Sequence, residues 1–207
     1  MSDVKGKVFI VQGPTASGKT TLAIQLAKKF QTEIISADSR QFYQEMSIGT
    51  AKPSSEELAQ VKHHFVHSHS IYNEVSASQY AQVAKPILDD LLARNQAAVI
   101  VGGSGMFIDA LTLGLDEIPH DKKVQEKWIA LHETEGLEFL QNELARLDPV
   151  YFAEVDTNNP VRLIRALEVI ELTQKPFSES RKGKVKYDYD IVRYGIAWNR
   201  SDLYERI

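Results

Sequence analysis

The 207-residue sequence contains no cysteine, which excludes disulfide bridges and thiolate metal sites and suits a reducing compartment. It has no apolar run approaching the roughly 18 residues of a membrane span, and no signal-peptide pattern opens it. It also lacks an excess of positive charge, because it contains 24 Lys and Arg residues and 28 Asp and Glu residues. Any basic surface must therefore be local. We expect a cytoplasmic protein without membrane segments, in which 43% hydrophobic residues form a globular core.

Short apolar runs that end on glycine or an acid predict strands. The run at residues 7–13 ends on glycine and precedes a helical segment at about 20–30. Similar runs cover 32–38 and 97–101, with a helical pattern at about 77–94 between them. Nearly continuous apolar runs separated by helices are typical of a parallel sheet covered on both faces, so the fold class is α/β. Within the helical pattern, Pro86 should kink or split the helix.

The pattern becomes helical after residue 114. Residues 124–147 predict two amphipathic helices that separate near Gly136. A third helix begins at Asn159-Pro160, a favoured N-cap followed by a favoured first position. A polar and basic stretch follows, and 191–198 predicts one more strand. We expect a core at 1–114, a helical insertion at 115–190, and a return strand with the start of a further helix at 191–207.

The sequence Gly13-Pro14-Thr15-Ala16-Ser17-Gly18-Lys19-Thr20 fits the phosphate-binding loop G-x-x-x-x-G-K-[ST]. It lies between a predicted strand and a predicted helix, as this motif requires. Its glycines let the backbone wrap a phosphate, the N–H groups and helix N-terminus supply partial positive charge, and Lys19 adds a full one. The Thr20 hydroxyl is placed to coordinate Mg²⁺. We therefore predict a P-loop NTPase-like core, whose anion is a nucleoside triphosphate or another diphosphate.

A strand-end aspartate that would hold Mg²⁺ in many P-loop ATPases is missing, because the third apolar run continues as Val101-Gly102-Gly103-Ser104. The nearest acid at a strand end is Asp38, on the edge where ligands of open α/β sheets bind. It would act as a general base toward a group held within about 3 Å. Alternatively it would join Thr20 as a Mg²⁺ ligand, or only cap a turn before Ser39.

Five blocks of the chain together resemble the tRNA dimethylallyltransferases. They are GPTASGKT at 13–20, DSRQFY at 38–43, GTAKP at 49–53, GGSGMF at 102–107 and RLIRALE at 162–168. The most specific part is DSRQFY joined to GTAKP. Ser104 stands where that family more often has threonine, which keeps a hydroxyl. Members of the family continue beyond Ile207, so the chain looks C-terminally truncated, with Arg206 as a candidate phosphate ligand.

The resemblance implies transfer of a dimethylallyl group from its diphosphate to N6 of an adenine next to the tRNA anticodon. The P-loop would hold dimethylallyl diphosphate and Mg²⁺ rather than ATP, with Lys19 and Thr20 absorbing the developing charge and Asp38 as the general base. The residues expected to meet the flipped adenine or the surrounding tRNA, including the arginines of the insertion, are Asp38, Ser39, Arg40, Gln41, Ser104, Arg162 and Arg165.

Two other functions stay open: prenylation of a free adenine nucleotide, and a P-loop kinase without prenyl chemistry. The helical insertion and the Arg162/Arg165 pair favour tRNA over a free nucleotide, although paired arginines on a helix are also common on solvated surfaces. The missing strand-end acid argues against a kinase. We expect a monomer.

Four of the six histidines, at positions 63, 64, 67 and 69, raise the question of a zinc site. Their spacing is poor for one site and no further ligand motif accompanies them. Trp128 and Trp198 are most simply explained as core aromatics.

Overall fold

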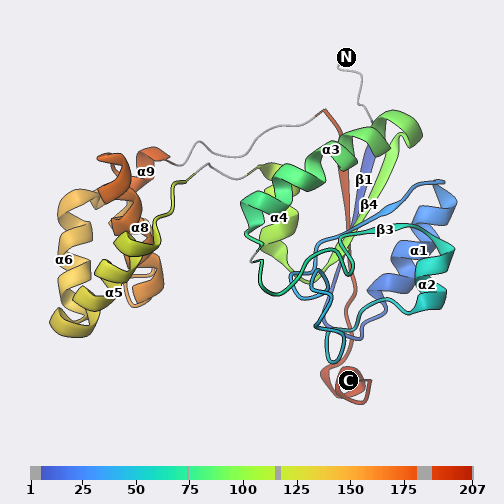
Figure 1. The fold of residues 1–207 in the computed structure, drawn as a ribbon, viewed down its shortest axis with the longest axis horizontal. Coiled ribbons are helices and arrows are strands. Elements are labelled where there is room, and N and C mark those ends of the chain that lie inside the picture. Colours follow the sequence, from blue (N-terminus) through green and yellow to red (C-terminus); the bar gives the residue numbers. More distant parts are fainter. Residues whose placement is uncertain (1–5, 74, 115–117, 181–187, 207) are drawn as a thin grey trace. The chain divides into compact units, whose positions relative to one another are not determined.

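The structure is a computed structural model that describes residues 6–73, 75–114, 118–180 and 188–206. The chain divides into two compact units, one formed by Met1–Leu115 with Val185–Ile207 and the other by Asp116–Lys184 (Figure 1). The basic stretch at 181–186 and the predicted boundary at 115 lie outside the described residues. The exact limits of the insertion therefore remain predictions.

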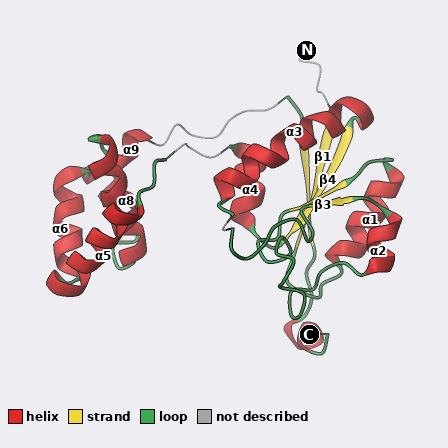
Figure 2. Ribbon diagram, in the orientation of Figure 1, coloured by secondary structure: helices red, strands yellow, loops and turns green. Residues whose placement is uncertain are grey.

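The first unit is built on five parallel strands (Figure 2). Their order across the sheet is β3-β2-β4-β1-β5, and their bounds are Lys7–Gln12 for β1, Ile34–Ser36 for β2, His63–His64 for β3, Ala97–Gly102 for β4 and Asp190–Gly195 for β5. The α/β fold with a parallel sheet is thus confirmed. Four strands were predicted, whereas β3 has only two residues and gives no periodic signal.

Helices cover both faces of this sheet. Alternate residues of β1 point to opposite sides, so Val8 and Ile10 belong to one apolar cluster and Phe9 and Val11 to another. The first cluster is completed by α3 (Ala77–Asn95) and α4 (Gly105–Leu113), and the second by α1 (Lys19–Lys29). A short helix, α2 (Ser55–Gln60), precedes β3, and α10 (Arg200–Tyr204) follows β5.

Helix α3 runs through Pro86 without being split. Proline has no N–H to donate to the carbonyl group of Gln82, four residues earlier. Both residues are exposed, so water can satisfy that carbonyl group. The predicted split is therefore wrong, whereas the kink that was its alternative stays a prediction.

Strands β2 and β4 approach so closely at their carboxyl ends that only glycine fits at position 102. A Cβ atom built there would lie 2.2 Å from the carbonyl oxygen of Ala37. The Ala37 N–H donates to the Val101 carbonyl at 2.7 Å, and the Ser104 N–H donates to the Ala37 carbonyl at 3.3 Å. The end of β4 is thereby fixed against the residue that precedes Asp38.

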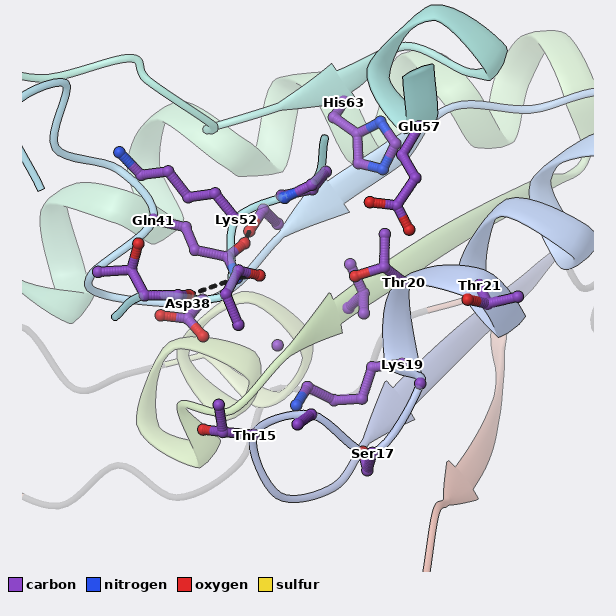
Figure 3. Close-up of a pocket in the computed structure, with 18 of the residues that line it drawn as sticks. Thr15, Ser17, Lys19, Thr20, Thr21, Asp38, Gln41, Lys52, Glu57 and His63 are labelled. Atoms are coloured by element: carbon purple, nitrogen blue, oxygen red, sulfur yellow. Dashed lines mark hydrogen bonds between the residues drawn. The ribbon is translucent and has the colours of Figure 1, made fainter. Parts of the chain in front are cut away.

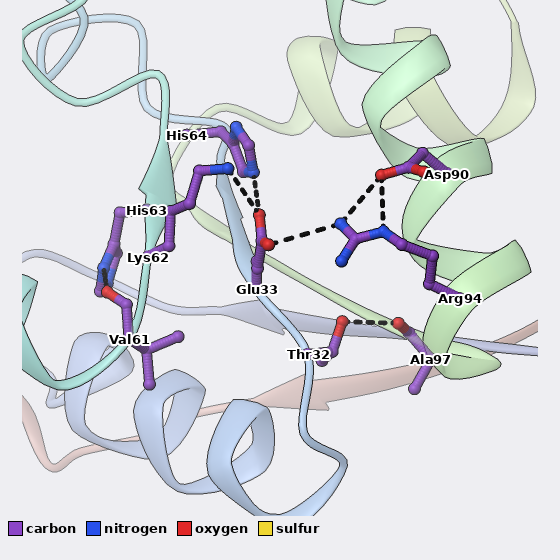
Figure 4. A network of polar contacts seen from close by, with 9 residues as sticks. All are labelled: Thr32, Glu33, Val61, Lys62, His63, His64, Asp90, Arg94 and Ala97. Atoms are coloured by element: carbon purple, nitrogen blue, oxygen red, sulfur yellow. Dashed lines mark hydrogen bonds and ion pairs between the residues drawn. The ribbon is translucent and has the colours of Figure 1, made fainter.

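An ionic network ties the amino end of β2 to its neighbours (Figure 4). The Glu33 carboxylate lies 2.6 Å from His64 Nε2, 3.1 Å from Lys62 Nζ and 3.4 Å from Arg94 Nη2 of α3. Burial raises the pKa of Glu33, but the hydrogen bonds from His64, Lys62 and Arg94 outweigh it and hold the pKa below its usual value. The network therefore stabilises the end of the sheet opposite the P-loop.

The second unit is helical, with α5 at Lys122–Glu135, α6 at Leu137–Leu147, α7 at Pro149–Glu154, α8 at Pro160–Thr173 and α9 at Phe177–Ser180. The break at Gly136 and the Asn159 cap, whose side chain accepts from Arg162 N, are as predicted. Helix α7 was not predicted. It begins at a buried Asp148 that accepts from Tyr151 N at 3.0 Å and from Ser178 N at 2.7 Å, which links α7 to α9.

No helix among the described residues is long and apolar enough to cross a membrane.

Candidate phosphate-binding site

The P-loop connects β1 to α1 at the carboxyl edge of the sheet. Ala16 and Gly18 have left-handed backbone angles, φ 61° and 91°, so the chain wraps around before α1 begins. The C-terminal segment supports this loop: Trp198 Nε1 donates to the Ser17 carbonyl and Arg206 Nε donates to the Ala16 carbonyl, both at 3.0 Å. These bonds fix the peptide planes of the loop, whose N–H groups at a helix N-terminus can bind an anion.

The prediction for Trp198 is wrong, since 42% of this residue is exposed and its indole supports the P-loop. The guanidinium group of Arg206 lies 4.5 Å from the centre of the Trp198 ring and stacks on it. The core prediction for Trp128 is confirmed, because only 7% of it is exposed within the second unit.

A cavity of about 450 Å³ opens above the P-loop (Figure 3). Residues 15–21 line one side of it. The opposite wall comes from the end of β2, the following loop, α2 and β3, and includes Asp38, Gln41, Lys52, Glu57 and His63. The volume suits a small-molecule ligand.

Lys19 and Asp38 face this cavity from its two sides. The Lys19 ammonium group donates to the Pro14 carbonyl at 2.6 Å, so it lies beside the P-loop and adds a positive charge to it. Burial lowers the pKa of Lys19, and the negative charge of Asp38 partly opposes this. The two side chains are thus close enough to interact electrostatically.

The Asp38 carboxylate is held by its own turn. Its Oδ1 accepts from the Arg40 N–H at 3.1 Å, and its backbone carbonyl accepts from the Gln41 N–H at 3.1 Å. A Cβ atom at Gly103 would lie 3.7 Å from Oδ2, so the small residues after β4 leave room beside the carboxylate. Asp38 therefore caps a turn and also lines the cavity, while its roles as a general base or a Mg²⁺ ligand stay predictions.

The other predicted residues lie at differing distances from the cavity. Ser39 and Arg40 are exposed, and neither they nor Ser104 line the cavity. Gln41 lines it, but its Nε2 donates to the carbonyl groups of Thr50 and Ala51 at 3.2 and 3.0 Å. Gln41 therefore joins the DSRQFY block to the GTAKP block and positions the wall of the cavity.

Gly13 and Pro14 also lie outside the cavity lining. A Cβ atom at Gly13 would come within 3.0 Å of the Ile196 carbonyl oxygen and of Ser17 Oγ. Gly13 thus allows the C-terminal segment to approach the loop, while Pro14 supplies the carbonyl group that Lys19 contacts.

The lining suits Mg²⁺, which prefers oxygen ligands and usually keeps several bound waters. Thr20, Asp38 and Glu57 bring a hydroxyl group and two carboxylates to the cavity. Ser17 and His63 also line the cavity. In the part of the chain that the structure describes, Ser17 Oγ and His63 Nε2 are buried and have no hydrogen-bond partner. Within the described residues no group of three or more His, Cys, Asp or Glu could hold an ion, so ligand oxygens would complete the coordination.

Lys52, Glu57 and His63 were not assigned to the site from the sequence. A signal was present for Glu57, because Ser54-x-x-Glu57 is a capping box. The histidines do not gather around one point: His64 pairs with Glu33, and His67 Nδ1 lies 3.2 Å from Lys52 Nζ. Of the four clustered histidines, His63 alone lines the cavity.

Arg162 and Arg165 lie on α8 of the second unit and differ in environment. Arg162 is exposed, whereas the Arg165 guanidinium group donates to the carbonyl groups of Pro119 and Ile118 at 2.9 and 3.2 Å. It also lies 2.8 Å from the Glu168 carboxylate, which is fully buried. Arg165 therefore fastens the start of the insertion to α8.

Burial raises the pKa of Glu168, but hydrogen bonds from Arg165, the Asp121 N–H and His120 together hold it below its usual value. No pattern within RLIRALE distinguishes this glutamate, since helix periodicity alone does not separate a buried acid from a solvated one.

The strand, loop and helix with Lys19 and Thr20 define a P-loop α/β protein with a cavity beside its loop. The family described as IPP transferase matches residues 41–207, and the chain belongs to this family. The family suggested by the five sequence blocks is thereby confirmed.

Named relatives agree with this assignment. The chain is 43% identical over 202 residues to tRNA dimethylallyltransferase 2 of Azobacteroides pseudotrichonymphae, covering 97% of this chain and 66% of that protein. It is 40% identical over 209 residues to tRNA dimethylallyltransferase of Cytophaga hutchinsonii, covering 100% and 69%. The chain thus spans about two thirds of the length of these relatives.

Solved structures give the same result. A full-length tRNA isopentenylpyrophosphate transferase from Bacillus halodurans matches with a TM-score of 0.60 at 33% identity, over 97% of this chain and 63% of that one. A eukaryotic dimethylallyltransferase acting on tRNA matches with a TM-score of 0.78 at 25% identity, over 97% and 50%.

Proposed function

We propose that the protein transfers a dimethylallyl group from dimethylallyl diphosphate to N6 of an adenine next to the tRNA anticodon, releasing diphosphate. One observation carries this proposal: the P-loop and the Asp38 carboxylate line the same cavity. An anion held on the loop would thus lie beside a base. The names of the relatives, which act on tRNA with a prenyl donor, support the same reaction.

In this reaction the bond between the allylic carbon and the diphosphate oxygen breaks, and its electron pair leaves with the diphosphate. The N6 lone pair forms the new carbon–nitrogen bond, and the amine proton passes to the Asp38 carboxylate. The P-loop N–H groups and Lys19 stabilise the charge that accumulates on the leaving diphosphate. Lys19 must turn from the Pro14 carbonyl toward the anion for this purpose.

Thr20 would hold Mg²⁺ together with diphosphate oxygens, with Asp38 as a further candidate ligand. When bound, the ion supplies positive charge to the leaving group. The hydroxyl groups of Thr15 and Ser17 lie on the loop side of the cavity, where they would donate to the diphosphate. The backbone from Thr15 to Gly18 would form the rest of the cradle, while Gly13 and Pro14, which lie outside the cavity lining, would keep the loop in shape.

The tRNA-contacting residues belong to both units. Ser39 and Arg40 are exposed beside Asp38, and Ser104 follows β4, so these side chains would meet the adenine and its neighbours. Gln41 would contact the adenine while positioning the wall. In the insertion, Arg162 would meet tRNA phosphates, and Arg165 would do so only while keeping its structural contacts. We further propose that the protein acts as a cytoplasmic monomer, which sedimentation analysis would test.

The direct test is incubation of the protein with dimethylallyl diphosphate, Mg²⁺ and unmodified tRNA, followed by mass spectrometry of the nucleosides. Parallel reactions contain AMP or ATP in place of tRNA. We expect a prenylated adenosine from tRNA only. Modified AMP would instead support prenylation of free nucleotides, and consumption of ATP with no prenylated product would support a kinase.

Asp38→Asn tests the proposed base. Asparagine keeps the shape and can still accept the Arg40 N–H, but it cannot take the proton. Single-turnover prenyl transfer should fall by about 10² to 10⁴, while diphosphate binding survives. A rate within a few-fold of wild type would place the base elsewhere. An equal loss of metal-dependent diphosphate affinity would identify Asp38 chiefly as a Mg²⁺ ligand.

A further inference from the structure

The end of β4 carries no acid near the P-loop, since Val101 is followed by Gly102 and Gly103. A metal ion at Thr20 therefore has no carboxylate from that strand to orient its waters. The opposite wall of the cavity, formed by α2 and β3, offers two acceptors instead. These are the Glu57 carboxylate and the His63 imidazole, which line the cavity together with Thr20.

His63 presents a lone pair that the protein leaves unused. Its Nδ1 lies 2.8 Å from the Val61 carbonyl oxygen, which can only accept, so Nδ1 carries the proton. Burial lowers the pKa of His63, which keeps the imidazole neutral and leaves Nε2 as an acceptor. Among the described residues this buried Nε2 has no hydrogen-bond partner. A buried acceptor in that state is costly unless a ligand or water donates to it.

Glu57 is held in place next to this acceptor. Its Oε2 accepts from the Ser54 N–H at 2.8 Å, and its own N–H donates to Ser54 Oγ at 3.2 Å. This capping box fixes the side chain, while Oε1 accepts no hydrogen bond from the described residues. In Figure 3 the His63 ring and the Glu57 side chain lie near each other, and the Glu57 carboxylate points toward Thr20. A donor that enters this part of the cavity can therefore bond to both acceptors.

We propose that Glu57 and His63 accept hydrogen bonds from water molecules on the Mg²⁺ that Thr20 and the diphosphate hold, and so replace the missing strand-end acid. This inference rests on the proposed diphosphate site. Mg²⁺ keeps several waters, and each of these waters donates strongly. Because Mg²⁺ prefers oxygen ligands, the imidazole Nε2 accepts a hydrogen bond from a bound water and does not bind the ion directly. Such partners typically change metal affinity by 10- to 100-fold.

The experiment uses Mn²⁺ as a paramagnetic substitute and inorganic diphosphate as the anion. Mn²⁺ binding is followed by EPR with and without diphosphate, in the wild type, Glu57→Gln and His63→Phe. Glutamine at this position still completes a capping box, so α2 is retained. Glu56→Gln is the matched control, because Glu56 is the exposed neighbour on the same helix and does not line the cavity. Thermal unfolding without ligand confirms that each variant is folded.

We expect Glu57→Gln and His63→Phe each to weaken Mn²⁺ binding in the presence of diphosphate by about tenfold or more. Metal-free diphosphate binding should be unchanged, as should Mn²⁺ binding by Glu56→Gln. His63→Gln, which returns an acceptor oxygen, should recover part of the loss. Wild-type Mn²⁺ affinity in both main variants would overturn the inference.

Two other results would also overturn it. An equal loss of metal-free diphosphate binding would mean that the residues act on the anion or on the loop. A strong ¹⁴N coupling in pulsed EPR that disappears in His63→Phe would show direct ligation by the imidazole. If the wild type bound no diphosphate at all, the proposed function would fail together with this inference, whereas normal diphosphate binding with unaffected variants would refute the inference alone.

Discussion

The contact between Gly102 and Ala37 allows a single added methyl group to test whether the position of Asp38 depends on the spacing between the ends of β2 and β4. A Cβ atom at position 102 would lie 2.2 Å from the Ala37 carbonyl oxygen, against 3.4 Å for an ordinary contact. In Gly102→Ala the ends of β2 and β4 must therefore separate by about 1.2 Å. The nearest atoms all belong to the backbone of Ala37, which is hydrogen-bonded to Val101 and Ser104, so they cannot yield by rotating a side chain.

Asp38 directly follows Ala37, so this separation moves the proposed base relative to the P-loop by about 1 Å. A misplacement of that size costs about 10²-fold in rate. Overpacking should also lower the free energy of unfolding by about 1–3 kcal/mol. Single-turnover prenyl transfer to tRNA measures the first effect, and urea unfolding measures the second.

The control for this prediction is Gly105→Ala, where an added Cβ meets nothing within 4 Å. It should leave the rate unchanged, since Gly105 begins α4 and does not line the cavity. A Gly102→Ala protein that retained wild-type rate and stability would refute the reasoning, because the two strand ends would then be free to adjust. A loss of stability without a loss of rate would show that β4 moves and Asp38 does not.

Three further predictions follow from the charged residues. Lys19→Ala should weaken calorimetric binding of inorganic diphosphate by about 10- to 100-fold, since a charge-assisted contact contributes about 1.5–3 kcal/mol; unchanged affinity would remove Lys19 from the site. The pKa of Glu33 is lowered on folding. The stabilisation that its carboxylate provides should therefore be complete above its unfolded pKa of about 4.3 and be lost as pH falls through the lower folded value. In Glu33→Gln the free energy of unfolding should consequently depend less on pH in the acid range. Arg162→Ala should flatten the salt dependence of tRNA binding by about 0.7–0.9 in log–log slope; equal slopes for wild type and Arg162→Ala would leave Arg162 as solvated surface. Arg165→Ala should destabilise the insertion by about 3 kcal/mol, because the buried Glu168 carboxylate loses its arginine partner and keeps the contacts with His120 and the Asp121 N–H.

The sequence predicted the parts of this fold that depend on local pattern. Apolar runs and their glycine ends were sufficient for β1, β4 and the P-loop, and the N-cap at Asn159 was sufficient for the start of α8. The elements that escaped prediction are those with too few residues for a period. Strand β3 exists because Ile34 and Ile35 offer a free edge to His63 and His64, which is a property of the folded sheet and not of a two-residue segment.

In the candidate site, too, the contacts between distant parts of the chain could not be predicted from local sequence. The motif predicts which residues would contact a diphosphate, but it does not predict which residues stabilise the conformation of the loop. Those residues are Trp198 and Arg206, which are 181 and 190 residues away from their acceptors in the chain. Periodicity is read over windows of about 11–18 residues, so no local pattern can reveal such a pair.

The indole of Trp198 was assigned to the core for the same reason: composition favours burial of tryptophan, and only the return of β5 beside β1 shows where its N–H donates. The residues on the opposite wall of the cavity could not be predicted from local sequence either. Ser54-x-x-Glu57 predicts a capped helix wherever it occurs, and only the pairing of β3 with β2 brings that carboxylate and the His63 imidazole to the Thr20 side of the cavity. The phosphate-binding motif is therefore encoded locally, whereas the positions of Glu57 and His63, which we propose orient its ligands, depend on the order of strands in the sheet.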